Sequence, residues 1–428
     1  MSSKVKLEII ESDSNYVATI VKLPELRKVD WLDNLMVANV FGYNCLVSKD
    51  SNPDSLYVFF PAESVLSEKF LSWNNLYRKS ELNCEKDKKW FFDESGRVKA
   101  VKFKWVVSSG LLIPVSSLQI IGKYLELKEG ESFHIMDWEK VCWKYRRPVA
   151  PEKLTKSQRI SKRLEKFDIV IPNQFRFHVD TPQFLRFIQD FKEWDRVVIT
   201  EKLHWTSAVF SNVLVKKKLW IIDRIAKIFW ASVNDTEYRH LYSSRTVIKN
   251  DDIDDERNKW GGYYWEDLWW IYAKQLESKI EKGITLYGEI VGYKPSWAYI
   301  QKGYHYGCKE WESKFYVYRM TYTTPDGIVV EFTDSQIRQY CSLRSLAVVP
   351  LLQSMTYYND DEFLNDTWLL DNIEVMCPLN DNKVPREWVV IRRDGQETYS
   401  AYKLKSQLFL TWETKQLDEG WEDLESNS

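Results

Sequence analysis

The chain is poor in glycine and carries almost no net charge. Its 428 residues include 15 glycines, whereas average usage of about 7% would give roughly 30. The formal net charge is −2 at pH 7. A protein without an overall basic field must contact nucleic acid through local patches of positive charge.

Paired cysteines and long apolar runs are also missing. The six cysteines are scattered without a CxxC pair, which argues against a zinc site or a disulfide scaffold and for a reducing compartment. No apolar run approaches the length of about 20 residues that a membrane helix needs. The first ten residues do not resemble a signal peptide. We therefore expect a cytoplasmic protein, in a bacterial or virus-infected cell, with no membrane contact and no protein partner.

The distribution of residue types predicts two domains. Residues 1–145 contain short runs of β-branched and aromatic residues separated by turn signals, a pattern typical of a small all-β barrel. Residues 146–172 are rich in Lys and Arg and are expected to form a basic linker, which either contacts phosphates or is simply solvated. We predict a second domain over residues 173–416 and an acidic tail over residues 417–428.

A lysine follows the predicted strand Arg196–Ile199 in the second domain. This residue, Lys202, lies in the stretch TEKLHWTSAVF and is preceded by Glu201. Burial of an ammonium group is costly, and desolvation or nearby cations lower its pKa and free the amine to act as a nucleophile. Taken alone, however, Lys202 is better explained as a surface lysine at the end of a strand.

Four further segments follow Lys202 in a fixed order. Two are strand-like: LYGEIVG at Leu286–Gly292, with a single carboxylate, and the aromatic FYVYRMTY at Phe315–Tyr322. The third, EWVVIRR, places an acidic residue ahead of a strand at Glu387–Arg393. The fourth, AYKLK at Ala401–Lys405, has two lysines at strand spacing and therefore on one face.

This order of segments resembles the covalent nucleotidyltransferases, which comprise DNA ligases, RNA ligases and mRNA-capping enzymes. Their pattern is a lysine in KxDG or KxHG, then a GE strand, an aromatic strand, EGxV and KxK. The histidine in KLH is most similar to the ATP-dependent RNA ligases. The resemblance covers roughly residues 168–419 and implies an α+β fold, with antiparallel sheets flanked by helices. The first 150 residues resemble the N-terminal OB domain of one branch of these ligases, which either binds RNA or only packs on the catalytic domain.

The resemblance implies a three-step reaction with ATP as the AMP donor. Lys202 would form a lysyl-AMP adduct, AMP would pass to a 5′-phosphate end of RNA, and a 3′-OH end would displace it, sealing the strand in RNA repair. A divalent ion, Mg²⁺ or Mn²⁺, would bridge phosphate oxygens. Its implied ligands are Glu387 and Glu289. The residues implied to contact the nucleotide are Glu201, Leu203, Arg245, Glu289, Tyr318, Lys403 and Lys405.

Two departures from the family pattern are tryptophans at positions of glycine, Trp205 and Trp388. The chain has 20 tryptophans and 15 glycines, and several tryptophans occupy turn-like sequences that favour glycine. We hypothesise that many of them are glycines encoded by a UGA codon that some genetic codes read as glycine. The strongest cases after these two are Trp194, Trp311, Trp138, Trp90 and Trp105.

Three functions remain open at this point. The first is the RNA ligase, and the second is a catalytically dead module that binds nucleotide or RNA, in which Trp205 and Trp388 are genuine. The third is a DNA ligase or capping-type enzyme, against which the histidine His204 and the preceding OB-like domain both argue. That histidine could contact substrate or metal, but a structural role is the stronger interpretation.

Overall fold

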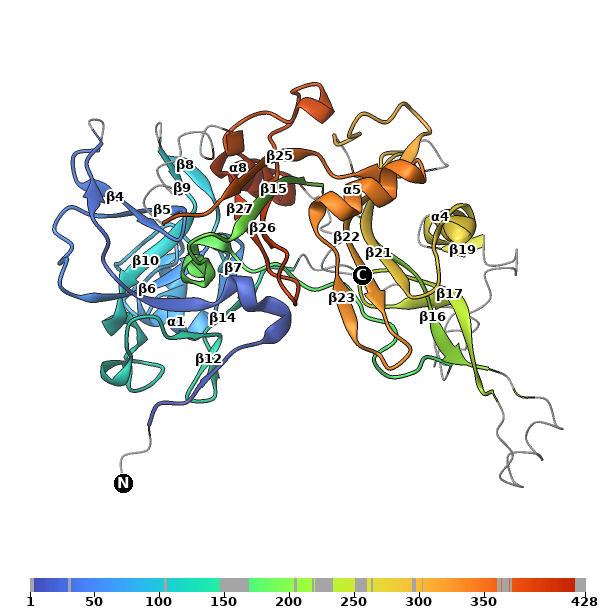
Figure 1. Cartoon of the computed structure of the whole chain (residues 1–428). Coiled ribbons are helices and arrows are strands. Elements are labelled where there is room, and N and C mark those ends of the chain that lie inside the picture. The colour runs from blue at the N-terminus through green and yellow to red at the C-terminus, as the bar shows by residue number, and fades with distance from the viewer. Residues whose placement is uncertain are drawn as a thin grey trace.

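The computed structural model describes the chain in segments (Figure 1). These are residues 4–29, 32–103, 106–146, 169–203, 206–217, 219, 234–250, 260–262, 265–294, 298–301, 303–359, 363, 369 and 372–419. Most of the predicted linker and tail, as well as His204, Trp205 and Trp105, lie outside them. No helix among the described residues is long and apolar enough to cross a membrane.

The N-terminal part is built from short strands in several small antiparallel sheets. Its largest sheet has the order β10-β6-β2-β11. The strands are β1 (Leu7–Glu8), β2 (Ala18–Lys22), β3 (Leu26–Arg27), β4 (Leu35–Val40), β5 (Tyr43–Ser48), β6 (Leu56–Pro61), β7 (Ser64–Leu66), β8 (Val101–Phe103), β9 (Val106–Ser108), β10 (Gly110–Pro114), β11 (Ser132–Phe133), β12 (Ile135–Met136), β13 (Glu139–Lys140) and β14 (Cys142–Lys144). The helices are α1 (Glu68–Trp73) and the 3-10 turns η1 (Glu11–Tyr16), η2 (Ser80–Leu82), η3 (Val115–Leu118) and η4 (Tyr124–Glu126).

The strand pairing in this part does not close into one barrel among residues 4–146. Separate sheets of two to four strands are joined by apolar packing, with Phe60 and Phe133 in one fully buried cluster and Phe59 in the next. The all-β composition is therefore as predicted, whereas the OB-like closure is not confirmed. Many of the strands have only two or three residues, too few to make a continuous hydrogen-bonded ladder.

The rest of the chain contains two larger sheets. The smaller has the order β25-β15-β26-β27, and the larger has the order β18-β17-β16-β21-β22-β23, with β24 added beside β22. The strands are β15 (Arg196–Lys202), β16 (Thr206–Lys216), β17 (Thr236–Ser243), β18 (Ile248–Asn250), β19 (Trp260–Gly262), β20 (Trp265–Glu266), β21 (Ile284–Gly292), β22 (Ser313–Thr323), β23 (Val329–Glu331), β24 (Ala347–Val348), β25 (Leu351–Thr356), β26 (Trp388–Asp394) and β27 (Ala401–Lys405). The helices are α4 (Leu268–Leu276), α5 (Asp334–Leu343), α8 (Gln407–Asp418) and the 3-10 turns η5 (Phe184–Arg186), η6 (Ile188–Asp190), η8 (Glu277–Lys279) and η9 (Pro378–Asn380).

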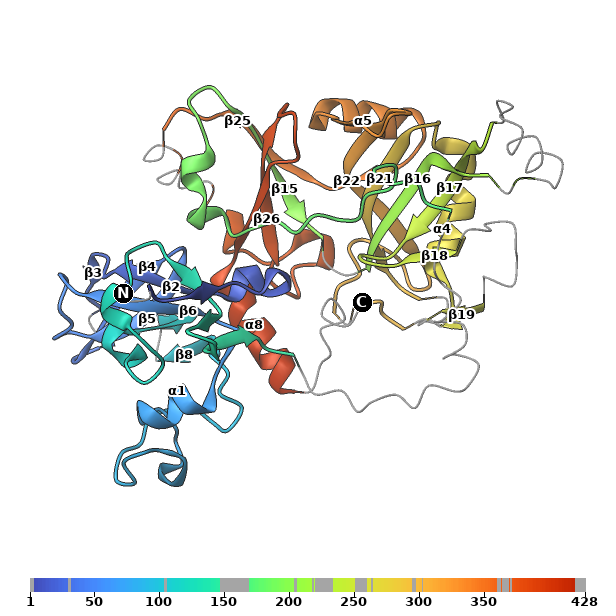
Figure 2. The ribbon, with the colours of Figure 1, turned by 90° about the horizontal axis from the view of Figure 1, so that it is seen from below.

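The chain passes from the smaller sheet to the larger one directly after Lys202. Strand β15 pairs with β25 and β26, whereas the next strand, β16, pairs with β17 and β21. Figure 2 shows β15 and β26 on one side of this crossing and β16, β21 and β22 on the other. Lys202 is therefore the last residue of a strand where two sheets meet, which is a natural place for a site shared by both.

The sequence over residues 181–191 predicts an amphipathic helix, with Phe184, Leu185, Phe187, Ile188 and Phe191 on or near one face, but this prediction is wrong. The backbone at Pro182 accepts a hydrogen bond from the amide of Lys403 at 2.8 Å, and Gln183 forms a bridge with that same strand. The segment therefore begins as extended chain beside β27 and continues as two 3-10 turns, η5 and η6. The sequence also predicts a helix over Trp265–Lys282. The helix in the structure is shorter, because α4 begins at Leu268 behind the N-cap Asp267 and ends at Leu276.

Helix α8 packs against the N-terminal strands. Leu410 belongs to the same buried cluster as Phe59 of β6. The buried Arg97 donates to Glu63 at 2.6 Å and to Asp418, near the end of α8, at 2.9 Å. Figure 2 shows this helix, in red, beside the blue N-terminal sheets. The strand that carries the two lysines of the KxK pattern is thus continuous with a helix fixed on the N-terminal part.

Candidate active site

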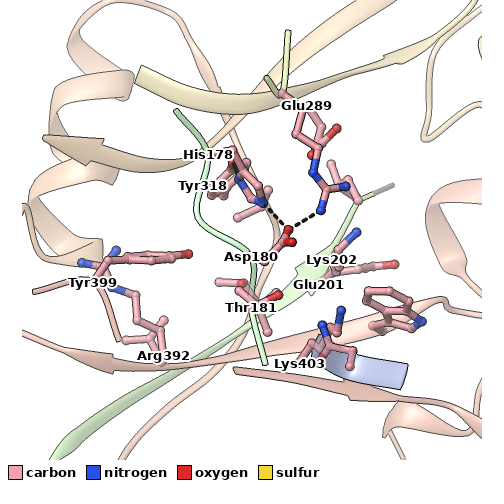
Figure 3. A pocket seen from close by; sticks show the side chains of 18 of the residues that line it. His178, Asp180, Thr181, Glu201, Lys202, Glu289, Tyr318, Arg392, Tyr399 and Lys403 are labelled. Carbon is pink, nitrogen blue, oxygen red and sulfur yellow. Dashed lines mark hydrogen bonds and ion pairs between the residues drawn. The ribbon is translucent and has the colours of Figure 1, made fainter. Parts of the chain in front are cut away.

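A cavity lies where the two sheets meet, and both sheets contribute side chains to it (Figure 3). Lys202 and Lys403 reach it from the smaller sheet, and Glu289 and Tyr318 reach it from the larger one. Its further lining residues that the sequence predicted are Glu201, Leu203 and Arg245. Seven of the predicted site residues, distant in sequence, therefore share one cavity.

The smaller sheet aligns the lysines through its strand register. Lys202 of β15 is opposite residue 388 of β26, and residue 388 is opposite Lys405 of β27. The Lys202 Nζ atom lies 3.7 Å from the Glu387 Oε1 atom, and the side chains of these two residues are 15% and 1% exposed. Because paired β-strands hold their neighbours in fixed register, the nucleophile candidate on β15 and the basic pair on β27 are held at fixed positions on either side of β26.

The indole of Trp388 fills the centre of this arrangement. The Nζ atoms of Lys202, Lys403 and Lys405 lie 4.6, 4.6 and 4.4 Å from its ring centroid. An aromatic face attracts such cations. The indole therefore occupies the space that an anion bound by the three lysines would need.

Lys405 is buried and forms an ion pair beneath the cavity. Its Nζ atom lies 3.2 Å from the Glu413 Oε2 atom on α8, and its side chain is 5% exposed. Burial alone would lower the pKa of Lys405, but Glu413 and the nearby Tyr16 and Tyr43 hold this pKa well above its usual value. Lys405 is therefore charged at neutral pH and adds positive potential under the cavity.

The larger sheet supplies a carboxylate and an aromatic ring. Glu289 of β21 is nearly buried, and Tyr318 of the neighbouring strand β22 lines the same cavity. Burial and the nearby Glu289 carboxylate raise the pKa of the Tyr318 hydroxyl well above its usual value. The Tyr318 Oη atom lies 2.5 Å from the Nδ1 atom of His178, and the two rings meet edge to face with their centroids 5.8 Å apart.

A second polar group connects to this tyrosine. His178 Nε2 lies 3.8 Å from Asp180 Oδ1, and Asp180 also forms an ion pair with Arg245 (Figure 3). The predicted Arg245 is thus linked to the predicted Tyr318 through His178 and Asp180, which sequence reasoning missed. The sequence did carry a weak signal, since the polar residues in FRFHVDT alternate with apolar ones ahead of the first strand.

The N-terminal part also lines the cavity. Ser12, Asn15 and Tyr16 reach it from η1 and the residues beside it, and Lys144 reaches it from β14. The sequence analysis assigned none of them to the site, because their approach depends on how the two parts pack and leaves no local pattern. The cavity is therefore formed by both parts of the chain.

The predicted residue Glu201, and Arg319 beside Tyr318, have clear structural partners. The Glu201 carboxylate accepts from the Cys377 thiol at 3.1 Å and lies 3.5 Å from the Arg386 Nε atom. Arg319, which follows Tyr318 on β22, donates from Nε to Glu331 at 3.0 Å. Its guanidinium also lies 4.4 Å from the ring centroid of Tyr399. These contacts hold the Glu201 and Arg319 side chains in fixed positions.

The metal prediction rests on two carboxylates. Among the residues that the structure describes, no group of three or more His, Cys, Asp or Glu side chains is placed to hold a metal ion. Hard cations such as Mg²⁺ and Mn²⁺ take oxygen ligands and usually keep several waters. The carboxylates Glu387 and Glu289 therefore fit an ion held mainly by water and by the oxygens of a bound phosphate, not a closed protein site.

Comparison with known proteins agrees with this geometry. Residues 195–405 match the RNA ligase family model. Solved structures of Naegleria gruberi RNA ligase are similar to this chain over most of its length. A mutant of that ligase with AMP and Mn aligns with a TM-score of 0.58 and 14% sequence identity, and the alignment covers 92% of this chain and 97% of the Naegleria chain. Another mutant of the same ligase, with ATP and Mn, aligns with a TM-score of 0.57 and 14% sequence identity, and the alignment covers 96% of this chain and 99% of the Naegleria chain. No curated protein sequence matches the chain. The resemblance predicted from the sequence motifs is confirmed.

Proposed function

We propose, from the RNA ligase domain at residues 195–405, that this protein is an ATP-dependent RNA ligase that joins 3′-OH and 5′-phosphate RNA ends through a lysyl-AMP intermediate. The observation that carries the proposal is the placement of Lys202, which is aligned by strand pairing with Lys403 and Lys405 and lies 3.7 Å from Glu387. Such a pairing of a nucleophile with a phosphate-binding group suits phosphoryl transfer, which depends mainly on positioning and charge neutralisation.

In the first step, the Lys202 amine attacks the α-phosphorus of ATP. A P–N bond forms, the bond to the pyrophosphate oxygen breaks, and the amine loses a proton. Two features of the site favour this step. Lys403 and the charged Lys405 would attract the phosphate oxygens and disperse their charge. Glu387 is close enough to hold the Lys202 amine in place by ion pairing before the nucleotide binds.

The nucleoside would be held by the larger sheet. The Tyr318 ring would stack on adenine, and its hydrogen bond with His178 supports this role because it holds the ring in one orientation. Glu289 would accept hydrogen bonds from the ribose hydroxyls, and Leu203, which is 2% exposed, would pack beside the base. Arg245, held by Asp180, supplies a further cation at the edge of the same cavity.

A divalent ion, Mg²⁺ or Mn²⁺, would supply charge neutralisation on the phosphates when bound. Glu387 would orient its water ligands, and Glu289 would be available as a second carboxylate. Glu289 lines the cavity from β21, and Glu387, which directly precedes β26, lies 3.7 Å from the Lys202 amine. The Naegleria ligase structures with Mn support this assignment of cofactor.

In the later steps, AMP passes from Lys202 to a 5′-phosphate end of RNA, and an RNA 3′-OH then displaces AMP to form a phosphodiester bond. The N-terminal part, as an OB-like module, would hold RNA beside the cavity. Lys144 of β14 supports this role, because it brings a cation from the N-terminal part to the site. A positive contact of this kind binds the phosphate backbone without reading sequence.

A second candidate function follows from one observation, the position of the Trp388 indole among the three lysines. If this side chain stays there, the phosphates of ATP do not reach Lys202, and the protein is a nucleotide- or RNA-binding module without ligase activity. The two functions differ in a single measurable product, the covalent AMP adduct.

The test is incubation with α-labelled ATP and a divalent ion, followed by denaturing electrophoresis. The proposal expects a labelled protein band in the Trp388→Gly protein and its loss in a Trp388→Gly/Lys202→Ala protein. Lys216→Ala in the same Trp388→Gly background is the matched control, since Lys216 is an exposed lysine at the far end of the next strand, β16. A label that survives Lys202→Ala contradicts the proposal. Sealing of nicks with RNA rather than DNA 3′-OH strands then tests the substrate, because the 2′-hydroxyl distinguishes the two.

A further inference from the structure

We propose that positions 138, 194 and 311, written as tryptophan, are glycine in the functional protein, through UGA codons read as glycine, and that position 388 in the active site is a fourth. The inference for the first three rests on backbone conformation alone. The inference for position 388, which lies in a strand, rests instead on the position of its indole among three lysines and on the proposed ligase function.

Three turns in the molecule share one design, and only one of them has glycine. The turn KEGE at residues 128–131 has Gly130 at φ +86°. The turns KEWD and KEWE, at residues 192–195 and 309–312, have Trp194 and Trp311 at the same place, at φ +72° and +64°. A turn with positive φ at its third residue is a glycine turn, because a β-carbon is strained there.

The hydrogen bonds of the three turns are the same. In each, the amide of the first residue donates to the carboxylate of the fourth, at 2.8, 2.9 and 3.0 Å. In each, the amide of the fourth residue donates to the carbonyl oxygen of the first, at 3.2, 3.0 and 2.9 Å. All three turns have lysine at the first position, glutamate at the second and a carboxylate at the fourth. Only the third position differs in kind, since it is glycine in KEGE and tryptophan in KEWD and KEWE. The two tryptophans add bulk at this position without a role in the turn.

A fourth turn, at residues 137 and 138, also has tryptophan where its backbone conformation favours glycine, although it is a different type of turn. Residues 137 and 138 form the two-residue loop between β12 and β13, where Met136 pairs with Glu139. Asp137 and Trp138 have φ +44° and +71°. A two-residue loop with both φ values positive is a type I′ hairpin turn, for which Asp-Gly is among the strongest choices.

These tryptophans differ from those that the fold uses. Trp269 is buried in α4, and its indole Nε1 donates to the carbonyl oxygen of Ser207 at 3.0 Å. Trp138, Trp194 and Trp311 are instead 76%, 68% and 62% exposed. Tryptophan supplies three of the twelve non-glycine residues with positive φ in the described part of the chain, although it makes up only 20 of 428 residues.

The exposed indoles do have some contacts. The Nζ atom of Lys6 lies 3.4 Å from the Trp138 ring centroid, and the Trp194 and Tyr358 rings meet with centroids 5.2 Å apart. Both are contacts on the surface, where such interactions contribute little. The strain of a bulky residue at positive φ acts in the opposite direction at the same positions.

Position 388 matters for the reaction. Its indole is 4% exposed and lies between three lysines, on the strand position that is paired with Lys202. Glycine there leaves the strand pairing of β26 unchanged and removes the ring, which opens the space between the lysines to phosphate. Under this proposal, residue 388 decides whether the nucleotide reaches the nucleophile.

The first experiment measures stability and needs no activity. Thermal unfolding is measured for the protein with tryptophan at all of these positions and for three single variants, Trp194→Gly, Trp311→Gly and Trp138→Gly. Relief of strain at positive φ is expected to raise Tm by about 2 °C for each change. The matched control, Trp269→Gly in α4, is expected to lower Tm, since it removes a buried side chain. A fall in Tm for both Trp194→Gly and Trp311→Gly overturns the proposal.

The second experiment identifies the residue directly. Peptide mass spectrometry of the protein made in its own source, together with the codons of its gene, is expected to show glycine and UGA at 138, 194, 311 and 388. UGG codons at 194 and 311 overturn the proposal and leave the ligase function untouched.

The third experiment separates the two proposals at position 388. The recoding proposal expects Trp388→Gly to raise formation of the AMP adduct by at least about 100-fold over the protein as written, because an occluded phosphate site is opened. Equal adduct formation in both proteins overturns the inference for position 388. If UGA is found at 388 and a protein with both Trp205→Gly and Trp388→Gly still forms no adduct, the recoding holds and the ligase proposal fails.

Discussion

The two sheets that enclose the cavity carry different chemistry. The smaller sheet brings the positive charges, with Lys202 and Lys403 lining the cavity and Lys405 buried beneath it. The larger sheet brings Glu289 and Tyr318, a carboxylate and an aromatic ring. We infer that one sheet binds phosphate and the other binds the nucleoside. Changes in the smaller sheet should therefore affect the chemical step, and changes in the larger sheet should affect nucleotide affinity.

The largest effect that tests this division is expected for the two lysines of β27. In a Trp388→Gly background, Lys403→Ala and Lys405→Ala should each slow adduct formation by about 100-fold or more, because each removes a cation from the phosphate site. Lys405→Ala should also lower the free energy of unfolding by about 3 kcal/mol, since it leaves Glu413 beside an empty space in a largely buried ion pair.

The measurement is single-turnover adduct formation at saturating ATP, combined with urea unfolding. Lys403, which is half-buried and on the same face of the strand, serves as the comparison for stability. Equal losses of stability in the two variants would show that the Glu413 pair does not support the fold. A change in ATP affinity alone, with the rate at saturation unaltered, would contradict the assignment of this sheet to the chemical step.

A smaller effect is expected in the larger sheet at Glu289. Glu289→Gln keeps the shape of the side chain and removes its charge, so hydrogen bonds to a ribose are weakened. We expect the KM for ATP to rise by about tenfold, which corresponds to a hydrogen bond to a charged group, with a smaller change in kcat. Glu237→Gln, on β17 of the same sheet and outside the cavity lining, is the control. A fall in kcat with KM unchanged would instead favour a role for Glu289 in metal binding.

Two substitutions of Tyr318, on the larger sheet, separate the contribution of its ring from that of its hydroxyl. Tyr318→Ala removes the ring and should weaken ATP binding about fivefold or more, since loss of stacking on a base costs about 1 kcal/mol or more. Tyr318→Phe keeps the ring and loses only the contact with His178, so a weakening of about twofold is expected. Titration calorimetry with ATP measures both. Equal losses in the two variants would show that the hydroxyl, not the ring, is the functional group.

Much of the two-sheet site could be predicted from the sequence, because its residues lie on strands with strong local patterns. AYKLK is β27 from its first residue to its last, and LYGEIVG lies within β21. The five motifs were therefore placed on real strands in the right order. No comparable pattern marks His178, Asp180 or Tyr16, because these residues lie outside regular strands and reach the cavity only when distant parts of the chain pack together. The helix from Thr181 failed for a related reason, since backbone bonding to β27 decided its conformation.

The smallest expected effect lies outside both sheets, where Asp13 fixes the N-terminal edge of the cavity. Asp13 is 2% exposed, accepts from the Lys144 amide at 3.1 Å and pairs with Arg146. Burial alone would raise the pKa of Asp13, but these partners hold it below its usual value. A lowered folded-state pKa adds stability above the unfolded-state pKa of about 3.9, and this stability is lost as pH falls through the folded-state value.

Replacement of Asp13 by asparagine should therefore flatten the loss of stability below about pH 4 and leave adduct formation at neutral pH within about twofold. The pH dependence of stability is measured from urea unfolding midpoints at about six pH values between pH 3 and pH 7. Asp54→Asn, at an exposed loop position, is the control and should leave the profile unchanged. If Asp13→Asn slows adduct formation as strongly as Lys403→Ala, the N-terminal edge belongs to the phosphate site. The division between the two sheets would then be incomplete, because a third element would share the chemical step.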